Sequence, residues 1–242
     1  MDLSIGLLGP PGCGKTVQSV RLSHYYHLVH IAAGGLLRAE VAAGTPLGRA
    51  AAEHLARGRL VPGDLVLGIV RHRLLEADTQ EGFVLDGFPR KLSEARATDL
   101  MFSDLGTRLA WVFFLRVPDE TALDRTVTRL VCPDCGAVFN AKYKRPIPGE
   151  ICPACRSVLH ATGDGRVQCE VCGRPIGPRP DDRLEIVRDR LAEYRRETES
   201  VIDYYRAEGI LEEIDATADE DEVFLRILDR LGERRPGLGA AS

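Results

Sequence analysis

Short apolar runs alternate with helically spaced apolar positions along this chain, and the alternation predicts its elements. Apolar runs of this length, bounded by glycine, proline or polar residues, favour buried strands. Such runs occur at 3–9, 29–32, 82–87, 109–117 and 210–215. Helical stretches separate them, which is typical of a parallel sheet built from right-handed crossovers. The pattern therefore predicts an α/β fold.

Three helices are marked most clearly. One is predicted at 15–26, and a last one at 223–231 closes the fold, after which residues 232–242 read as a frayed tail. The longest helix is predicted from about Asp182 to Arg206. Its expected buried face consists of Leu184, Val187, Leu191, Tyr194, Val201 and Tyr205.

The segment from Cys132 to Pro180 breaks the alternation. It is rich in proline, glycine and cysteine and has few long apolar runs, so it is predicted to be an insert without a core of its own. The segment holds three Cys-x-x-Cys pairs, Cys132/Cys135, Cys152/Cys155 and Cys169/Cys172. The chain start reads as neither signal peptide nor membrane span, so we expect a reducing, cytoplasmic location. Paired cysteines there indicate metal binding.

The first predicted strand runs into a loop that matches the phosphate-binding pattern G-x-x-x-x-G-K-[ST]. The match covers Gly9 to Thr16, with the strand before it and the helix after it that this motif requires. Its glycines let backbone N–H groups curl around phosphate oxygens, and the helix N-terminus adds positive potential. Lys15 can reach the transferred phosphate and the Thr16 hydroxyl can bind Mg²⁺. Cys13 reads as a small loop residue. The motif predicts binding of a nucleoside triphosphate.

The composition of the chain mainly excludes certain classes of binding partner. The chain has 242 residues, 28% of them charged, and a net charge of −4. A negative balance argues against a general nucleic-acid or anionic-membrane surface, so neither partner is expected.

Seven further motifs follow the phosphate loop in order. They are HIAAGGLLR (30–38), GTPLG (44–48), LVPGD (60–64), LDGFPR (85–90), RTVTR (125–129), RPDD (179–182) and VRDRL (187–191). In this order and spacing the chain resembles the adenylate kinase family of nucleoside monophosphate kinases over nearly its whole length.

The resemblance implies a single P-loop domain, 1–242, of three layers, αβα, around a five-stranded parallel sheet. It also implies a small helical acceptor-binding insert at 32–61 and a mobile, zinc-ribbon-like lid at 128–182. The implied reaction is reversible transfer of the terminal phosphoryl group of Mg-ATP to a nucleoside monophosphate. The implied state is a monomer that binds ATP or ADP and the monophosphate.

The resemblance also assigns residues. Arg38 and Arg90 would hold the acceptor phosphate, Arg125 would stack over the donor base, and Asp86 would orient magnesium-bound water. The implied catalytic residues are Lys15, Asp86, Arg90, Arg129, Arg179 and Arg190. The implied ATP-binding residues are Gly9, Gly12, Cys13, Gly14, Lys15, Thr16, Val17, Arg125 and Arg129. The implied monophosphate-binding residues are Ala33, Arg38, Gly87, Arg90, Glu94, Arg179 and Arg190.

Some members of the family bind one structural zinc through two Cys-x-x-Cys pairs in the lid. Sixteen residues separate Cys135 from Cys152, which matches those members, yet the arginine expected seven residues after the last cysteine follows Cys172. Either the middle or the last pair is therefore extra, and His160 is a possible further ligand. Four of the six cysteines are expected to bind one zinc, and four thiolates close the site, which makes it structural.

Several positions depart from the family pattern. Val17 stands where threonine is usual, and Ala33 stands where a threonine contacts adenine. Glu94 replaces a glutamine that reads adenine, and a carboxylate accepts hydrogen bonds but donates none. GMP, CMP or UMP is therefore an alternative acceptor to AMP, which the overall resemblance favours. In a simpler alternative Glu94 faces solvent or pairs with Lys91.

Two alternatives belong to other functional classes. A zinc-ribbon nucleic-acid-binding module is disfavoured by the negative charge and by cysteine pairs that are not interleaved with aromatic and basic residues. A kinase-like module that binds ATP without turnover is disfavoured because every implied catalytic residue is present.

Overall fold

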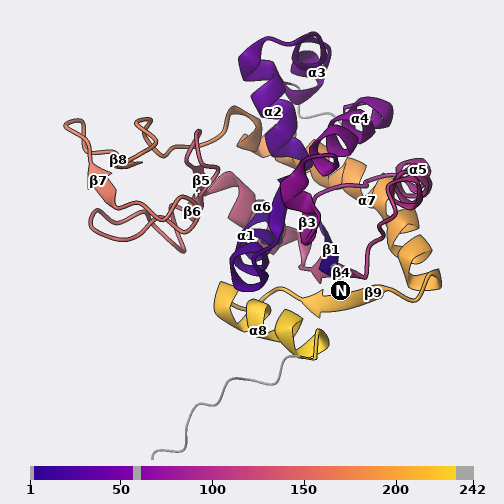
Figure 1. The fold of residues 1–242 in the computed structure, drawn as a ribbon. Coiled ribbons are helices and arrows are strands. Elements are labelled where there is room, and N and C mark those ends of the chain that lie inside the picture. Colours follow the sequence, from indigo (N-terminus) through magenta and orange to yellow (C-terminus); the bar gives the residue numbers. More distant parts are fainter. Residues whose placement is uncertain (1–2, 57–60, 233–242) are drawn as a thin grey trace, which may run out of the picture.

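The computed structural model describes residues 3–56 and 61–232, and its centre is a parallel sheet (Figure 1). All five strands run parallel in the order β2-β3-β1-β4-β9. Their bounds are Leu3–Leu8 (β1), Val29–Ala32 (β2), Gly82–Asp86 (β3), Trp111–Arg116 (β4) and Leu211–Asp215 (β9). These strands confirm the five predicted from the apolar runs.

Helices cover both faces of the sheet. Their bounds are Lys15–Tyr26 (α1), Ala33–Ala43 (α2), Pro46–Ala56 (α3), Gly63–Leu74 (α4), Leu92–Asp104 (α5), Asp119–Val127 (α6), Leu184–Ala207 (α7) and Glu220–Arg230 (α8). Short 3-10 turns occupy Ala77–Thr79 and Pro180–Asp182. The predicted α/β fold with a five-stranded parallel sheet is confirmed.

Two apolar clusters, one on each face of the sheet, join its strands to the helices, so that the fold has three layers. Side chains alternate along each strand, so Val84 joins one cluster while its neighbours Phe83 and Leu85 join the other. The first cluster contains residues of α2, α4, α5 and the end of α7, and the second contains residues of α1, α6, α8 and the start of α7. The sheet is thus buried on both faces, as parallel sheets require.

The long helix α7 contributes to both clusters. Val187 and Leu191 pack in the second cluster, and Val201 and Tyr205 pack in the first. The expected face is correct at these four positions but wrong at Leu184, which is 39% exposed because the helix only begins there. Residues 180–182 form a separate 3-10 turn, so the helix starts two residues later than predicted.

Two segments extend from this body in Figure 1. One is the pair α2 and α3, within the predicted insert 32–61, of which residues 57–60 lie outside the described part. The other leaves the side of the body after α6 and carries two antiparallel strand pairs. These pairs are Arg129–Val131 (β5) with Val138–Asn140 (β6), and Leu159–Ala161 (β7) with Val167–Cys169 (β8).

The second segment, hereafter the lid with its predicted bounds 128–182, has a separate and small apolar cluster. Its seven buried members are Cys132, Ala137, Phe139, Cys152, Leu159, Cys169 and Ile176. Three of the seven are cysteines, which agrees with the prediction of an insert that lacks an ordinary core.

The described helices give no membrane span, since none within 3–56 and 61–232 is both long and apolar enough.

The predicted helix at 223–231 is α8, which starts three residues earlier. The Asp219 side chain caps it by accepting from the N–H groups of Asp221 and Glu222. The predicted frayed tail lies, apart from Gly232, outside the described residues.

Candidate active site

The phosphate loop joins the end of β1 to the start of α1. Gly12 has φ 80°, and a Cβ there would lie 2.2 Å from the Ala122 carbonyl oxygen, so only glycine fits this turn. The Lys15 ammonium donates to the carbonyl oxygens of Gly9, at 2.5 Å, and Pro10, at 2.9 Å. No side chain caps the start of α1. The first-turn N–H groups are therefore available to an anion beside the lysine.

Asp86 lies at the carboxyl end of β3 and faces the loop. The Thr16 hydroxyl donates to Asp86 Oδ2 at 2.8 Å, and His30 Nε2 lies 3.5 Å from the same oxygen. Burial raises the pKa of Asp86, but His30, Lys15 and Thr16 together outweigh it, so the net pKa lies below the usual range. The carboxylate is therefore ionised at neutral pH, and it forms with the threonine hydroxyl a pair of oxygen ligands suited to Mg²⁺.

Asp182 joins two of the predicted arginines. Arg129 Nε donates to its Oδ2 at 2.8 Å while Nη2 of the same guanidinium donates to Oδ1, which makes the pair bidentate. Arg190 Nη1 lies 3.3 Å from Oδ1 and also donates to the Asp181 carbonyl oxygen at 3.1 Å. Asp182 is 5% exposed. One buried carboxylate thus fixes a guanidinium from β5 and another from α7.

The arginines are crowded. Burial, more than any other cause, lowers the pKa values of Arg38, Arg90 and Arg190. The pKa of Arg179 is lowered to about 9, first by burial and then by Arg129 and Arg38. These groups stay protonated at neutral pH, and an anion of several charges bound among them would relieve their mutual repulsion.

One cavity of ≈ 1600 Å³ connects the phosphate loop, the arginines and the lid. It opens at the carboxyl ends of the parallel strands, where ligands of such sheets bind. Fifteen of the residues predicted for catalysis and nucleotide binding line it: Gly9, Gly12, Cys13, Gly14, Lys15, Thr16, Val17, Arg38, Asp86, Gly87, Arg90, Arg125, Arg129, Arg179 and Arg190.

Two predicted acceptor residues lie outside this lining. Ala33 is 4% exposed and packs in the first apolar cluster. Glu94 is 8% exposed, and its Oε2 accepts from the backbone N–H groups of Arg90, at 2.8 Å, and Lys91, at 3.3 Å. It therefore neither faces solvent nor pairs with the Lys91 ammonium, and it fixes the start of α5. Contact of either residue with an acceptor base stays a prediction.

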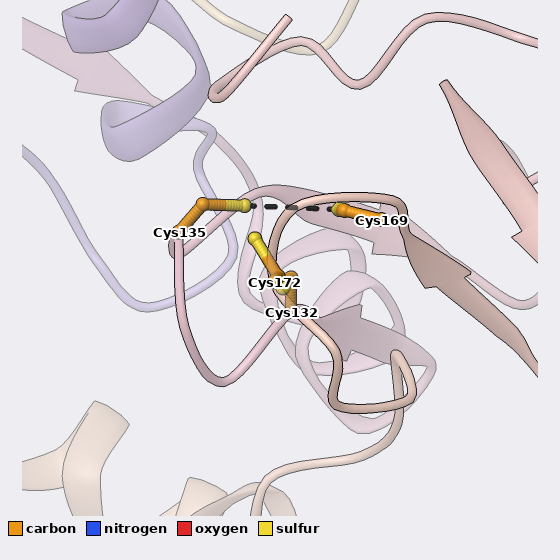
Figure 2. A group of neighbouring side chains, drawn as sticks. All are labelled: Cys132, Cys135, Cys169 and Cys172. Carbon is orange, nitrogen blue, oxygen red and sulfur yellow. Dashed lines mark hydrogen bonds between the residues drawn. The ribbon is translucent and has the colours of Figure 1, made fainter. Parts of the chain in front are cut away.

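The six cysteines of the lid gather in one place. Two overlapping sets each bring four sulfurs within 4.8 Å of one another. One set is Cys132, Cys135, Cys169 and Cys172, drawn in Figure 2, and the other is Cys135, Cys152, Cys155 and Cys169. All seven cysteines of the chain are free of disulfides.

The donor set fits zinc. Four thiolates at about 2.3 Å from a tetrahedral Zn²⁺ lie about 3.8 Å apart. Cys135 Sγ lies 3.8 Å from Cys152 Sγ and 3.9 Å from Cys169 Sγ. His160 belongs to neither set, and its ring lies 4.0 Å from the exposed Glu170 carboxylate.

Some residues of the site did not emerge from the sequence. Asp182 stands in the quoted motif RPDD, and its signal was an acid directly beside arginines that need a counter-charge. Thr198 donates to the Arg90 carbonyl oxygen at 3.1 Å from a position on α7 that carries no motif. Arg125, by contrast, was predicted, and it donates to the carbonyl oxygens of Ala216 and Thr217, both at 2.8 Å, and so holds the loop after β9 at the cavity.

Comparison with known proteins assigns the family. A family model described as adenylate kinase matches residues 7–210. The chain is 39% identical to an adenylate kinase of Archaeoglobus fulgidus over 93% of this chain and 96% of the relative. It is 41% identical to one of Thermodesulfovibrio yellowstonii over 90% and 93%, and 37% identical to one of Methanosarcina barkeri over 93% and 96%. These matches confirm the resemblance drawn from the motifs, and the chain belongs to the adenylate kinase family.

Proposed function

We propose that the chain catalyses the reversible transfer of the terminal phosphoryl group of Mg-ATP to AMP, which gives two ADP. Membership of the adenylate kinase family supports a nucleoside monophosphate kinase. The observation that carries the proposal is the one cavity lined both by the P-loop lysine and by Arg38, Arg90, Arg129, Arg179 and Arg190. Phosphoryl transfer needs little covalent help and much positive charge placed around the transferred group.

The donor side of the site uses the phosphate loop. Lys15 and the uncapped first turn of α1 hold the phosphates of ATP, in the lining of the cavity that Gly9, Gly12 and Gly14 shape. Thr16 and Asp86 present a hydroxyl and an ionised carboxylate 2.8 Å apart for Mg-ATP. The bound ion neutralises charge that develops on the phosphate oxygens. Thr16 supplies this hydroxyl although Val17 follows it.

The acceptor side uses Arg38 and Arg90. The Arg90 side chain donates from Nε to the Gly87 carbonyl oxygen at 2.9 Å, and its backbone is held by Glu94 and Thr198. Glu94 therefore acts on the acceptor through the position of Arg90. With Glu94 engaged in capping, its carboxylate is not left to read the base, and the choice of AMP over GMP, CMP and UMP is supported by membership of the adenylate kinase family.

The remaining arginines bridge body and lid. Arg129 and Arg179 lie at the two ends of the lid, and Arg190 lies on α7. Closure of the lid over both nucleotides would exclude water and bring these guanidinium groups around the transferring phosphoryl group. Structural zinc in the cysteine cluster would hold the lid in shape, because closed thiolate sites leave no open position for catalysis.

Initial rates test the proposal. Mg-ATP is offered with AMP, GMP, CMP or UMP in parallel, and the reverse reaction is followed with ADP alone. The proposal predicts turnover in both directions with a clear preference for AMP. Preference for another monophosphate would correct the acceptor, and ATP binding without turnover with any of the four would overturn the kinase assignment.

Two further expectations accompany the enzyme. The net charge of −4 supports the absence of a nucleic-acid partner, which a salt-dependent binding assay would test. A monomer is expected, and light scattering of the protein in solution would measure it.

A further inference from the structure

The three cysteine pairs of the lid share one backbone turn. In each pair the residue after the second cysteine donates its N–H to the carbonyl oxygen of the first cysteine. The distances are 3.1 Å from Gly136 to Cys132, 3.0 Å from Arg156 to Cys152, and 3.4 Å from Gly173 to Cys169. The donors have φ values of 73°, 61° and 74°. The middle pair is therefore built as the other two are.

The middle pair keeps this turn at a position where it is unfavourable. Glycine adopts a positive φ freely, but an L side chain such as that of Arg156 adopts it only under constraint. The two sulfurs of each pair belong to one four-cysteine set and lie within 4.8 Å of each other, as two ligands of one metal ion must. A pair left as two spare thiols would have no reason to hold Arg156 at φ 61°.

Burial repeats across the pairs as well. The first cysteine of each pair, at 132, 152 and 169, is 0% exposed, and the second of each is partly buried. The six sulfurs thus face one shared interior, although each pair comes from a different stretch of the lid.

The sulfur positions link all three pairs. Cys135 and Cys169 are 3.9 Å apart, point toward each other in Figure 2 and belong to both four-cysteine sets. Cys135 also lies 3.8 Å from Cys152, and Cys155 lies 4.0 Å from Cys172. Two tetrahedra of sulfur that share the edge from Cys135 to Cys169 account for the two distances from Cys135, whereas Cys155 and Cys172 belong to different tetrahedra and must separate from 4.0 Å to about 5 Å when both ions bind.

We propose that the lid holds two Zn²⁺ ions in one six-cysteine cluster, with Cys135 and Cys169 bridging both ions. Cys132 and Cys172 complete the first ion, and Cys152 and Cys155 complete the second. This proposal rests on the structural zinc proposed above and replaces the expected single ion on four of six cysteines. The sequence left open which pair is extra; in this cluster none is.

The charges and protons balance. All six thiols lose their protons to solvent as the two ions bind, the six Zn–S ligands become thiolates, and no electron is transferred. Six thiolates and two Zn²⁺ leave a net charge of −2, equal to that of one Zn²⁺ with four thiolates. The second ion thus brings the middle pair into the cluster at no added charge.

Metal content of the holoprotein gives the first test. Native mass spectrometry and elemental analysis of the wild-type chain, loaded with Zn²⁺ under reducing conditions, are expected to give two zinc ions per chain. The variant Cys152→Ser/Cys155→Ser is expected to retain one. The matched control Cys13→Ser removes the cysteine outside the cluster and is expected to retain two.

Bridging needs a second measurement, made on the wild-type chain so that it does not depend on a variant that folds. The protein is loaded with ¹¹³Cd²⁺ and examined by NMR. Two cadmium signals of equal intensity are expected, and the β-protons of Cys135 and Cys169 are expected to correlate with both. Those of the other four cysteines are expected to correlate with one each.

Each other outcome overturns a distinct statement. One zinc per chain, with Cys152 and Cys155 open to alkylation or joined by a disulfide, would overturn the two-ion cluster and leave a single structural zinc standing. Two ions without shared β-proton correlations would overturn the bridging. No zinc at all would overturn the structural zinc itself, whatever the kinase assay shows.

Discussion

The sheet body and the lid are stabilised by different forces. Among the described residues, the two clusters of the body contain 20 and 18 buried apolar residues, whereas the lid cluster contains seven, three of them cysteines. Burial of apolar surface can support the body alone. The lid resembles the small units that need a metal or a disulfide, and its cysteines are free of disulfides.

This difference matters because the site draws on both regions. Lys15 and Asp86 lie on the body, while Arg129 and Arg179 lie where the lid begins and ends. Phosphate and magnesium binding should therefore survive damage to the lid, and turnover should not. Variants in the two regions should therefore separate binding from turnover, with the largest effect at the phosphate loop.

Replacement of Lys15 by alanine removes the cation at the centre of the phosphate loop. Turnover is expected to fall about 100- to 1,000-fold, as for loss of one preorganised donor to a developing charge. The melting temperature and the zinc content should be unchanged, since both regions keep their packing. Lys91→Ala is the control, because the Lys91 ammonium lies 4.0 Å from the Glu197 carboxylate and Lys91 is not part of the cavity lining, and it should change the rate less than twofold. Equal rates for both variants would contradict the assignment.

Asp182→Asn breaks the connection between the lid boundary and α7. The neutral amide no longer balances Arg129 and Arg190, so their guanidinium groups should shift by about 1 Å and turnover should fall about tenfold to a hundredfold. ATP binding, measured by calorimetry, should weaken less than turnover, because Lys15 and the phosphate loop are untouched and only Arg129 of the implied ATP-binding residues is displaced. Asp203→Asn, an exposed carboxylate on the same helix that pairs with Arg206, serves as control. A loss of ATP affinity as large as the loss of turnover would refute the statement that the body binds the phosphates while turnover also needs the lid.

Glu94→Gln tests whether the buried carboxylate positions Arg90 or reads the base. A neutral acceptor caps the start of α5 less strongly, so the free energy of unfolding should fall by about 1 kcal/mol. The order of rates with AMP, GMP, CMP and UMP should stay as in the wild-type chain. A changed order would show that Glu94 contacts the base after all.

Arg156→Gly is expected to have the smallest effect and the opposite sign. Glycine removes the cost of a left-handed backbone at a residue with a side chain, which is roughly 1–2 kcal/mol. It also adds conformational entropy to the unfolded chain, which destabilises the fold by roughly 0.5–1 kcal/mol. The lid should therefore become more stable by about 0.5–1 kcal/mol. Slower transfer of zinc to a competing chelator would measure it. Gly173→Ala, at φ 74° in the third pair, should speed the transfer instead. No change in either variant would mean that the turns do not hold the metal.

The sequence predicted the body better than the lid for a physical reason. Strand runs and the phosphate loop are local patterns, and β1, its loop and α1 follow one another directly. Asp182 acts through a partner 53 residues away, and Glu94 is diverted to the backbone by its place at the start of a helix. Neither is visible in spacing alone. The six cysteines could be counted, but their convergence depends on how two hairpins fold together.

Amide hydrogen exchange of the zinc-loaded and zinc-free chains tests the central statement most directly. If apolar burial holds the body and metal holds the lid, removal of zinc should abolish protection at residues 130–178 and leave strands β1, β3 and β4 as protected as before. Loss of protection throughout the sheet, or full retention in the lid, would contradict it.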